Sequence, residues 1–120
     1  MVNIANIVDG VVNGLEELKI SDISVYDVAL SSHLTDFFIV STADSIIQLG
    51  AARTKIDDFM RKNKFPIKNP NEKWEGGWLI MDFVDIVVNV FLEEKRSFYA
   101  IDDLLRAGKI DFDEITNAHS

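Results

Sequence analysis

Two apolar runs that lie close together, residues 77–83 (GWLIMDF) and 85–92 (DIVVNVFL), constrain the fold more than any other part of the chain. Both are rich in β-branched and aromatic residues, which favour strands. Both are apolar at nearly every position instead of at alternate ones, and such strands need cover on both faces. The pattern therefore predicts two adjacent strands that form a central hairpin, buried on both faces.

The connection between these two strands is short and lacks glycine. A two-residue turn at Phe83 and Val84 would require positive φ, which a β-branched Val resists. We therefore expect a looser loop or a bulge at this point.

Earlier and later segments add two strands and three helices. The runs at 23–29 (ISVYDVA) and 35–42 (TDFFIVST) indicate strands, and we expect both to be mostly buried. In the first helix, Gly10 and Gly14 should each weaken the helix by about 1 kcal/mol relative to Ala. Apolar residues recur at helical spacing in three segments, of which the last ends at Gly108: 4–18, 49–60 and 93–107.

The expected element order, α-β-β-α-β-β-α, is typical of one α+β domain with helices packed on a mixed sheet. A chain of 120 residues with 48% hydrophobic residues and no Cys is long enough for one core but not for two. Both prolines fall in residues 63–73, which we expect to be a loop. The sequence thus predicts a domain over 1–108 and an acidic tail at 109–120.

The charge balance limits the partners. A formal net charge of -8 opposes binding to bare nucleic acid, which depends on clustered Lys and Arg, and favours a basic protein. No stretch approaches the roughly 18 unbroken apolar residues of a membrane helix. The start of the chain lacks a basic region followed by an apolar run. We expect a cytoplasmic protein that does not interact with membranes.

Several motifs, taken together, resemble one known family. They are V-x-D at 25–27, TDFFIVST at 35–42, S-x-x-Q at 45–48, GWLIMDxxDIVVxVF at 77–91 and R-x-F-Y at 96–99. In this order and spacing they resemble the ribosomal silencing factor family, also called Iojap-like, over about residues 20 to 105.

This resemblance implies a regulator that is not an enzyme and uses no cofactor. Such a protein would bind the large ribosomal subunit, through the ribosomal protein numbered fourteen, and sterically block joining with the small subunit. The resemblance also implies a nucleotidyltransferase-like core fold and a possible homodimer. An acidic domain is compatible with a basic ribosomal protein, because charge steers the encounter and a few buried aromatic side chains supply most of the affinity.

By the same resemblance, the docking surface maps to Trp78, Asp82, Phe83 and Asp85. Strand alternation places Trp78 and Asp82 on one face and Phe83 on the other, so they do not share one flat surface. We expect Asp82 and Phe83 to meet the partner and Trp78 to contribute from an edge or a partly buried position. The alternatives are core packing for Trp78 and a solvated turn for the two aspartates.

Other residues of the motifs have structural interpretations. Ser45 and Gln48 match the family and also form a capping box at the start of a helix, which we favour over direct contact. Asp36, in an apolar strand, needs a partner if buried. The candidate partner is Arg96, and the neighbouring Phe98 and Tyr99 belong to the same motif.

This chain also departs from the family pattern. Asn89 stands where His is common, and we expect a satisfied core amide there. Four further departures lie at turns or keep apolar character, so the scaffold should survive them: Ala43 and Val84 for glycines, Ile47 for an arginine and Leu105 for a tryptophan.

Two other classes of function remain to be weighed. Nucleotidyl transfer needs carboxylates gathered on Mg²⁺ beside a phosphate-binding loop of small residues. Here Asp82 and Asp85 are separated by a turn, and Asp44-Ser45 lacks the glycine of such a loop, so the sequence does not favour this activity. His33 and His119 lie far apart in a chain without Cys, which does not indicate a zinc site. The remaining alternative is a non-ribosomal interaction or dimerisation module on the same fold.

Overall fold

The computed structural model describes residues 3–29, 35–74 and 76–106. It confirms an α+β fold with the predicted order up to the last helix, which is divided in two. The predicted domain end near residue 108 and the tail at 109–120 lie outside the described residues. The elements are α1 (Ile4–Glu17), β1 (Ser21–Asp27), β2 (Phe37–Ala43), α2 (Ile46–Lys62), β3 (Trp78–Asp82), β4 (Ile86–Leu92), α3 (Glu93–Tyr99) and α4 (Ile101–Arg106).

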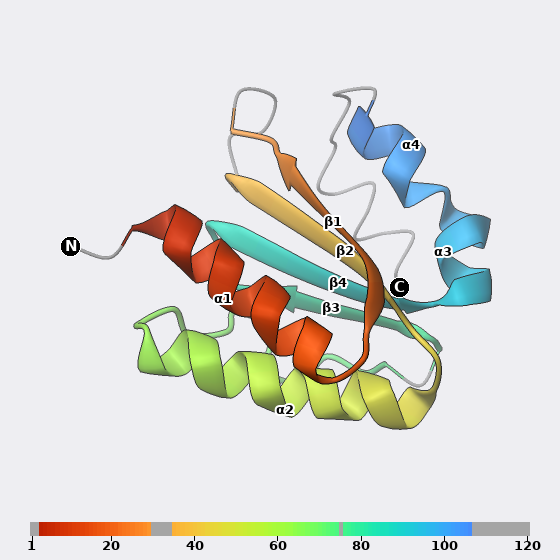
Figure 1. Ribbon diagram of the computed structural model, residues 1–120, viewed down its shortest axis with the longest axis horizontal. Coiled ribbons are helices and arrows are strands. Elements are labelled where there is room, and N and C mark those ends of the chain that lie inside the picture. The colour runs from red at the N-terminus through yellow and green to blue at the C-terminus, as the bar shows by residue number, and fades with distance from the viewer. Residues whose placement is uncertain (1–2, 30–34, 75, 107–120) are drawn as a thin grey trace.

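The four strands form one mixed sheet in the order β1-β2-β4-β3 (Figure 1). β2 and β4 are parallel, while β1 pairs with β2 and β3 with β4 in antiparallel fashion. The predicted hairpin of β3 and β4 is present, but it is not central. The chain crosses over through α2 and places β4 beside β2, so β3 becomes an edge strand.

Helices cover both faces of the sheet. Leu79, Met81 and Phe83 point into a core shared with α1 and α2, whereas Trp78 and Ile80 point into a second core that includes Ile101 of α4. This arrangement confirms the predicted alternation of side chains along β3. It also explains why β3 and β4 are apolar at nearly every position, since each has a core on either side.

β1 differs from the prediction that it would be mostly buried. β2 is almost entirely buried, but every residue of β1 is exposed or partly exposed, and Val25 has 44% of its surface accessible. The physical reason is that β1 lies at an edge of the sheet with no covering segment among the described residues, whereas the other edge strand, β3, is covered by the loop at 63–73.

The two glycines of α1 allow α2 to approach closely. A Cβ atom at Gly10 would lie 2.1 Å from the ring of Phe59, and one at Gly14 would lie 3.0 Å from Ile56 Cδ1. The two glycines lower the helix propensity of α1, but they allow close packing against α2. Any other residue type would require the neighbouring side chain of α2 to move.

The predicted last helix is broken at Ala100. This residue has φ 49° in the left-handed region, and its N–H donates to the carbonyl of Arg96, which ends α3 before α4 begins. The break matters because it turns Asp102, at the start of α4, back toward Arg96. The side chains of Phe98, Tyr99 and Leu105 lie outside the described part of the structure.

Residues 63–73 contain no helix or strand, as predicted, and part of this loop closes the free edge of β3. The Asn69 side chain donates to the Ile80 carbonyl at 2.8 Å and accepts from the Asp82 N–H at 2.9 Å. The Lys68 N–H donates to the Asp82 carbonyl at 2.7 Å. Edge groups of β3 are therefore bonded without another strand. No helix in the described ranges has the length and apolar character needed to cross a membrane.

Candidate partner-binding site

Four aspartates lie at one end of the sheet. Asp27 ends β1, Asp36 precedes β2, Asp82 ends β3 and Asp85 precedes β4. The registers Asp27 with Phe37, Phe37 with Ile86 and Asp82 with Val87 bring these strand ends to the same side. Asp27 and Asp85 are exposed and the other two are partly exposed. We call this set the acidic edge.

The β3–β4 loop presents an apolar side chain at this acidic edge. Phe83, Val84 and Asp85 form a three-residue loop, which confirms the predicted looser connection. Val84 nevertheless takes φ 74°, a conformation that we expected Val to avoid, and its side chain is 51% exposed. Its conformation is held by bonds around it, because Asp82 Oδ1 accepts from the Val84 N–H at 2.8 Å. The Asp85 N–H donates across Val84 to the Phe83 carbonyl at 3.0 Å.

Trp78 and Phe83 both lie beneath the surface. For Phe83 this differs from the expectation that its side chain meets the partner, and Trp78 is more deeply buried than the edge or partly buried position expected for it. Trp78 is 3% exposed, stacks on Phe91 with ring centroids 4.7 Å apart, and therefore has the core packing weighed as its alternative. Phe83 is 2% exposed, in the core on the other face. Of the four predicted docking residues, Asp82 and Asp85 are the two with accessible side chains.

Asn89 is a satisfied core amide, as predicted. Its Oδ1 accepts from Trp78 Nε1 at 3.0 Å, and its Nδ2 donates to the Ile39 carbonyl at 3.3 Å. These bonds use both ends of the amide in a fully buried place. Asn89 on β4 therefore fixes the position of the Trp78 ring, which comes from β3.

Ser45 and Gln48 have the predicted capping role. Ser45 Oγ accepts from the Gln48 N–H at 3.2 Å, and Gln48 Oε1 accepts from the Asp44 N–H, one residue earlier than in the usual capping box. Gln48 Nε2 also donates to the Leu18 carbonyl at 3.0 Å, so it joins the start of α2 to the end of α1.

Arg96 does not pair with Asp36, contrary to the prediction. Arg96 binds Asp102 through two bonds, from Nε at 2.8 Å and from Nη2 at 3.0 Å. Asp36 lies before β2, whereas Arg96 contacts Thr42 near the other end of that strand. A span of six strand residues covers about 20 Å, which is too far for one side chain to bridge.

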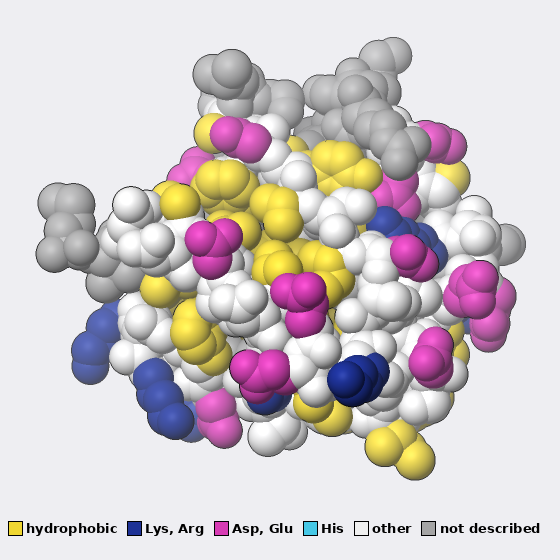
Figure 2. All heavy atoms as spheres, in the orientation of Figure 1, with side chains coloured by type: hydrophobic (Ala, Val, Ile, Leu, Met, Phe, Trp, Pro, Cys, Tyr) yellow, Lys and Arg dark blue, Asp and Glu magenta, His cyan; other side chains and the backbone are white. Residues whose placement is uncertain are grey.

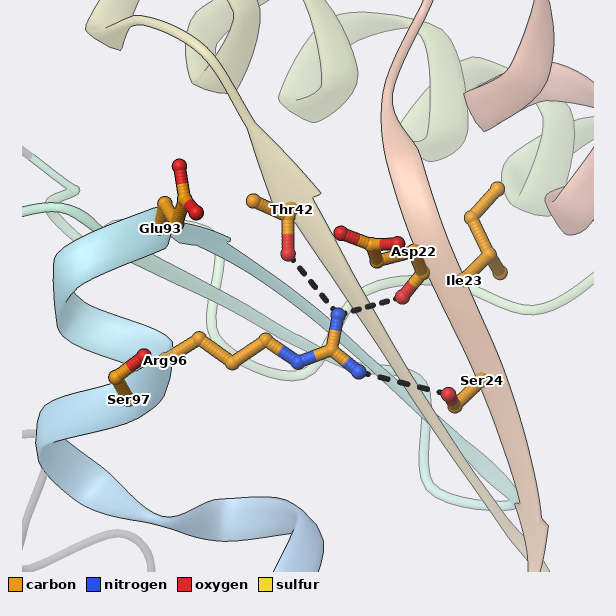
Figure 3. A pocket seen from close by; sticks show the side chains of 7 residues that line it. All are labelled: Asp22, Ile23, Ser24, Thr42, Glu93, Arg96 and Ser97. Atoms are coloured by element: carbon orange, nitrogen blue, oxygen red, sulfur yellow. Dashed lines mark hydrogen bonds between the residues drawn. The ribbon is translucent and has the colours of Figure 1, made fainter.

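The Arg96 guanidinium joins three elements at this far end of the sheet. It reaches from α3 across Thr42 of β2 to the Asp22 carbonyl and the Ser24 hydroxyl of β1, and it borders an open hollow of about 500 Å³ (Figure 3). The hydrogen bond to Asp102 raises the pKa of Arg96 above its ordinary value, against the opposing effect of burial. Arginine is charged at every physiological pH in any case, and the contact with Asp102 stabilises this charged form further.

Sequence reasoning missed several members of these sites. Asp102 was not predicted as a partner of Arg96, because residues six positions apart on a continuous helix do not face each other. Only the break at Ala100 brings the two side chains together. Asp27 was noticed only as part of a motif, since its place at the same end of the sheet as Asp85 depends on strand order. Within the described ranges, no group of three or more His, Asp or Glu side chains could hold a metal ion.

Comparison with known proteins assigns the chain to a family. The family model described as "Ribosomal silencing factor during starvation" matches residues 3–120. The chain belongs to this family. Curated relatives carry matching names: a ribosomal silencing factor from Bacillus subtilis is 28% identical over 89 residues, which is 74% of this chain and 75% of that protein. One from Chromobacterium violaceum is 29% identical over 101 residues, which is 84% of this chain and 83% of that protein.

Longer relatives and solved structures complete the comparison. The chloroplast protein Iojap of maize is 34% identical over 87 residues, or 72% of this chain, but the match spans only 38% of the maize protein. A crystal structure of a Chromobacterium violaceum protein superposes with a TM-score of 0.80, 28% identity and 87% coverage of each chain. A Bacillus halodurans structure, at 22% identity and TM-score 0.72, covers 83% of this chain and 93% of its own and shows the same fold.

Proposed function

We propose that this silencing-factor family member binds the large ribosomal subunit and sterically blocks joining with the small subunit, which represses translation. The observation that supports the proposal is the match of the silencing-factor family model to residues 3–120, together with relatives that are named ribosomal silencing factors. The proposed mechanism is occupancy of the joining face. It requires a stable docking surface but no covalent chemistry and no cofactor.

We propose the acidic edge as that docking surface, with the basic ribosomal protein numbered fourteen as partner. Asp82 and Asp85 flank the exposed Val84, so the loop combines negative charge with an apolar contact. In such an interface the charges mainly raise the association rate and set orientation, while the desolvated apolar contact lowers the dissociation rate. Trp78 and Phe83 contribute from within, because they hold β3 and its loop in place.

The first experiment is co-sedimentation of the protein with isolated large and small subunits, followed by a subunit-joining assay at the same concentrations. Binding to the large subunit alone, together with inhibition of joining, supports the proposal. Failure to bind either subunit at micromolar protein would refute it and favour a non-ribosomal interaction module.

The second experiment tests the acidic edge with the double variant Asp82→Asn and Asp85→Asn. Asn keeps the side-chain acceptor that bonds the Val84 N–H, so the loop should keep its shape while two charges are lost. We expect large-subunit binding to weaken by about 1 to 2 kcal/mol, and less so at high salt.

A matched control removes the same charge elsewhere. Glu16→Gln with Asp44→Asn alters two exposed acids near the opposite end of the sheet. Equal weakening by the two double variants would show that net charge alone matters and would contradict docking through the acidic edge.

A further inference from the structure

β1 presents backbone hydrogen-bonding groups away from the sheet. It is the first strand in the order β1-β2-β4-β3, so its outer side has no neighbouring strand among the described residues. The Val28 N–H donates inward to the Asp36 carbonyl at 2.8 Å, which sets the alternation of the antiparallel pair. By this alternation Tyr26 bonds toward β2, while the N–H and C=O groups of Val25 and Asp27 point outward.

The two edges of the sheet differ in how they are finished. The edge of β3 is bonded by Asn69 and Lys68 from the loop that runs beside it. At β1, a register shift between Ser21 and Ser24 interrupts the strand, and Arg96 binds the Asp22 carbonyl there. A bulge of this kind limits pairing at an edge, so the regular open stretch is Ser24–Asp27.

The side chains beside this stretch are apolar and are surrounded by acids. Val25 is 44% exposed, and the half-buried Ile23 and Phe37 pack against the core on the same face. Figure 2 shows apolar side chains gathered over this region, with acidic side chains around them. Asp22 and Asp27 on β1 itself are exposed. A strand added here would cover the apolar side chains and meet negative charge at both ends.

We propose that β1 pairs, over Ser24–Asp27, with a short, extended, basic segment of a partner protein on the large subunit. Strand addition explains the open backbone and the exposed Val25 together, because main-chain bonds supply affinity and side-chain contacts supply selectivity. The acidic surroundings select a basic segment. A second copy of this chain fits less well, since each copy carries a net charge of -8 and would place Asp22 and Asp27 against like charges. This inference rests on the proposed function.

The test compares Val25→Pro with Val25→Thr. Thr keeps a β-branched side chain of similar size and the outward N–H, whereas Pro removes that N–H and adds a ring at the edge, while the bonds from β1 to β2 remain. We expect Val25→Pro to bind isolated large subunits at least about tenfold more weakly than Val25→Thr. Thermal melting checks that both variants are folded. Hydrogen exchange on the wild-type protein gives an independent readout, with slower exchange of the Val25 and Asp27 amides when large subunits are bound.

The outcomes separate this inference from the proposed function. If the wild-type protein binds large subunits, yet the two variants bind equally and the two amides stay unprotected, β1 pairing is overturned and the proposed function stands. If the wild-type protein does not bind large subunits, both fail. A dimer of the protein alone that Val25→Pro abolishes would overturn the choice of partner in favour of self-pairing.

Discussion

Val84 combines three properties that seldom coincide in one residue. It is β-branched, it has positive φ, and it is half exposed in the β3–β4 loop at the acidic edge. Residues other than glycine in this region of conformational space cost about 1 to 3 kcal/mol, and they persist where surrounding bonds hold them. Here the bonds from Asp82 and across to Phe83 serve that purpose.

Replacing Val84 with Gly should therefore stabilise the fold. Glycine relieves the strain but adds flexibility to the unfolded chain, so we expect a net gain of about 1 kcal/mol in the free energy of unfolding. Urea denaturation measures it. Val84→Ala keeps a Cβ atom and should show little of this gain; a glycine variant no more stable than the alanine variant would contradict the strain argument.

At the scale of elements, a partly buried ion pair adds to the packing that joins α3 and α4 to the sheet. Asp102 accepts two bonds from Arg96 and one from the Tyr26 hydroxyl at 2.6 Å, so α4, α3 and β1 meet at this carboxylate. The pair is mostly shielded, with 15% of the Arg96 side chain and 19% of the Asp102 side chain accessible.

Asp102→Asn should destabilise the fold by about 2 kcal/mol, because it weakens charge-assisted hydrogen bonds that are strong in a place shielded from water. Hydrogen exchange should become faster in α3 and α4 before it does so in α2. The control is Asp9→Asn, at an exposed position of α1 away from the pair, which should change stability by less than about 0.5 kcal/mol. Similar losses in the two variants would rule out a special role for the pair.

The sequence was sufficient for most elements because their signals are local. Helical periodicity in α1 and α2 and the apolar runs of β3 and β4 reflect the faces that each element buries, and the structure confirms them. The break at Ala100 was missed because alanine favours helix and only tertiary contacts of Asp102 reveal the turn. The exposure of β1 was missed because composition does not distinguish an edge strand from an inner one.

The candidate site was less accessible to sequence reasoning than the fold. The motif around Trp78 and Asp82 was found, but the depth of Trp78 and Phe83 depends on which helices cover each face of the sheet. The acidic edge depends on strand order, since Asp27, Asp36, Asp82 and Asp85 are far apart in the chain. No local sequence pattern indicates either the depth of these side chains or the grouping of the four aspartates.

At the scale of the whole molecule, the described residues, which end at 106, form a core on each face of the sheet. We therefore expect that deleting residues 109–120 leaves the fold intact, with one cooperative thermal transition and little change in its midpoint. Circular dichroism during heating measures this. Loss of cooperative melting in the shortened protein would mean that the tail completes the core.

The parallel pairing of β2 with β4 has a consequence for how this protein is made. Each pair in that ladder joins residues about fifty positions apart. β4 is an inner strand of the sheet, yet it follows β1, β2, α2 and β3 in the chain. During synthesis, β1, β2 and α2 emerge first, but β2 then lacks β4, its parallel neighbour at the centre of the sheet. The sheet can close only after β4 has left the exit tunnel, so the native sheet should form in one step once β4 has emerged, and not strand by strand during synthesis.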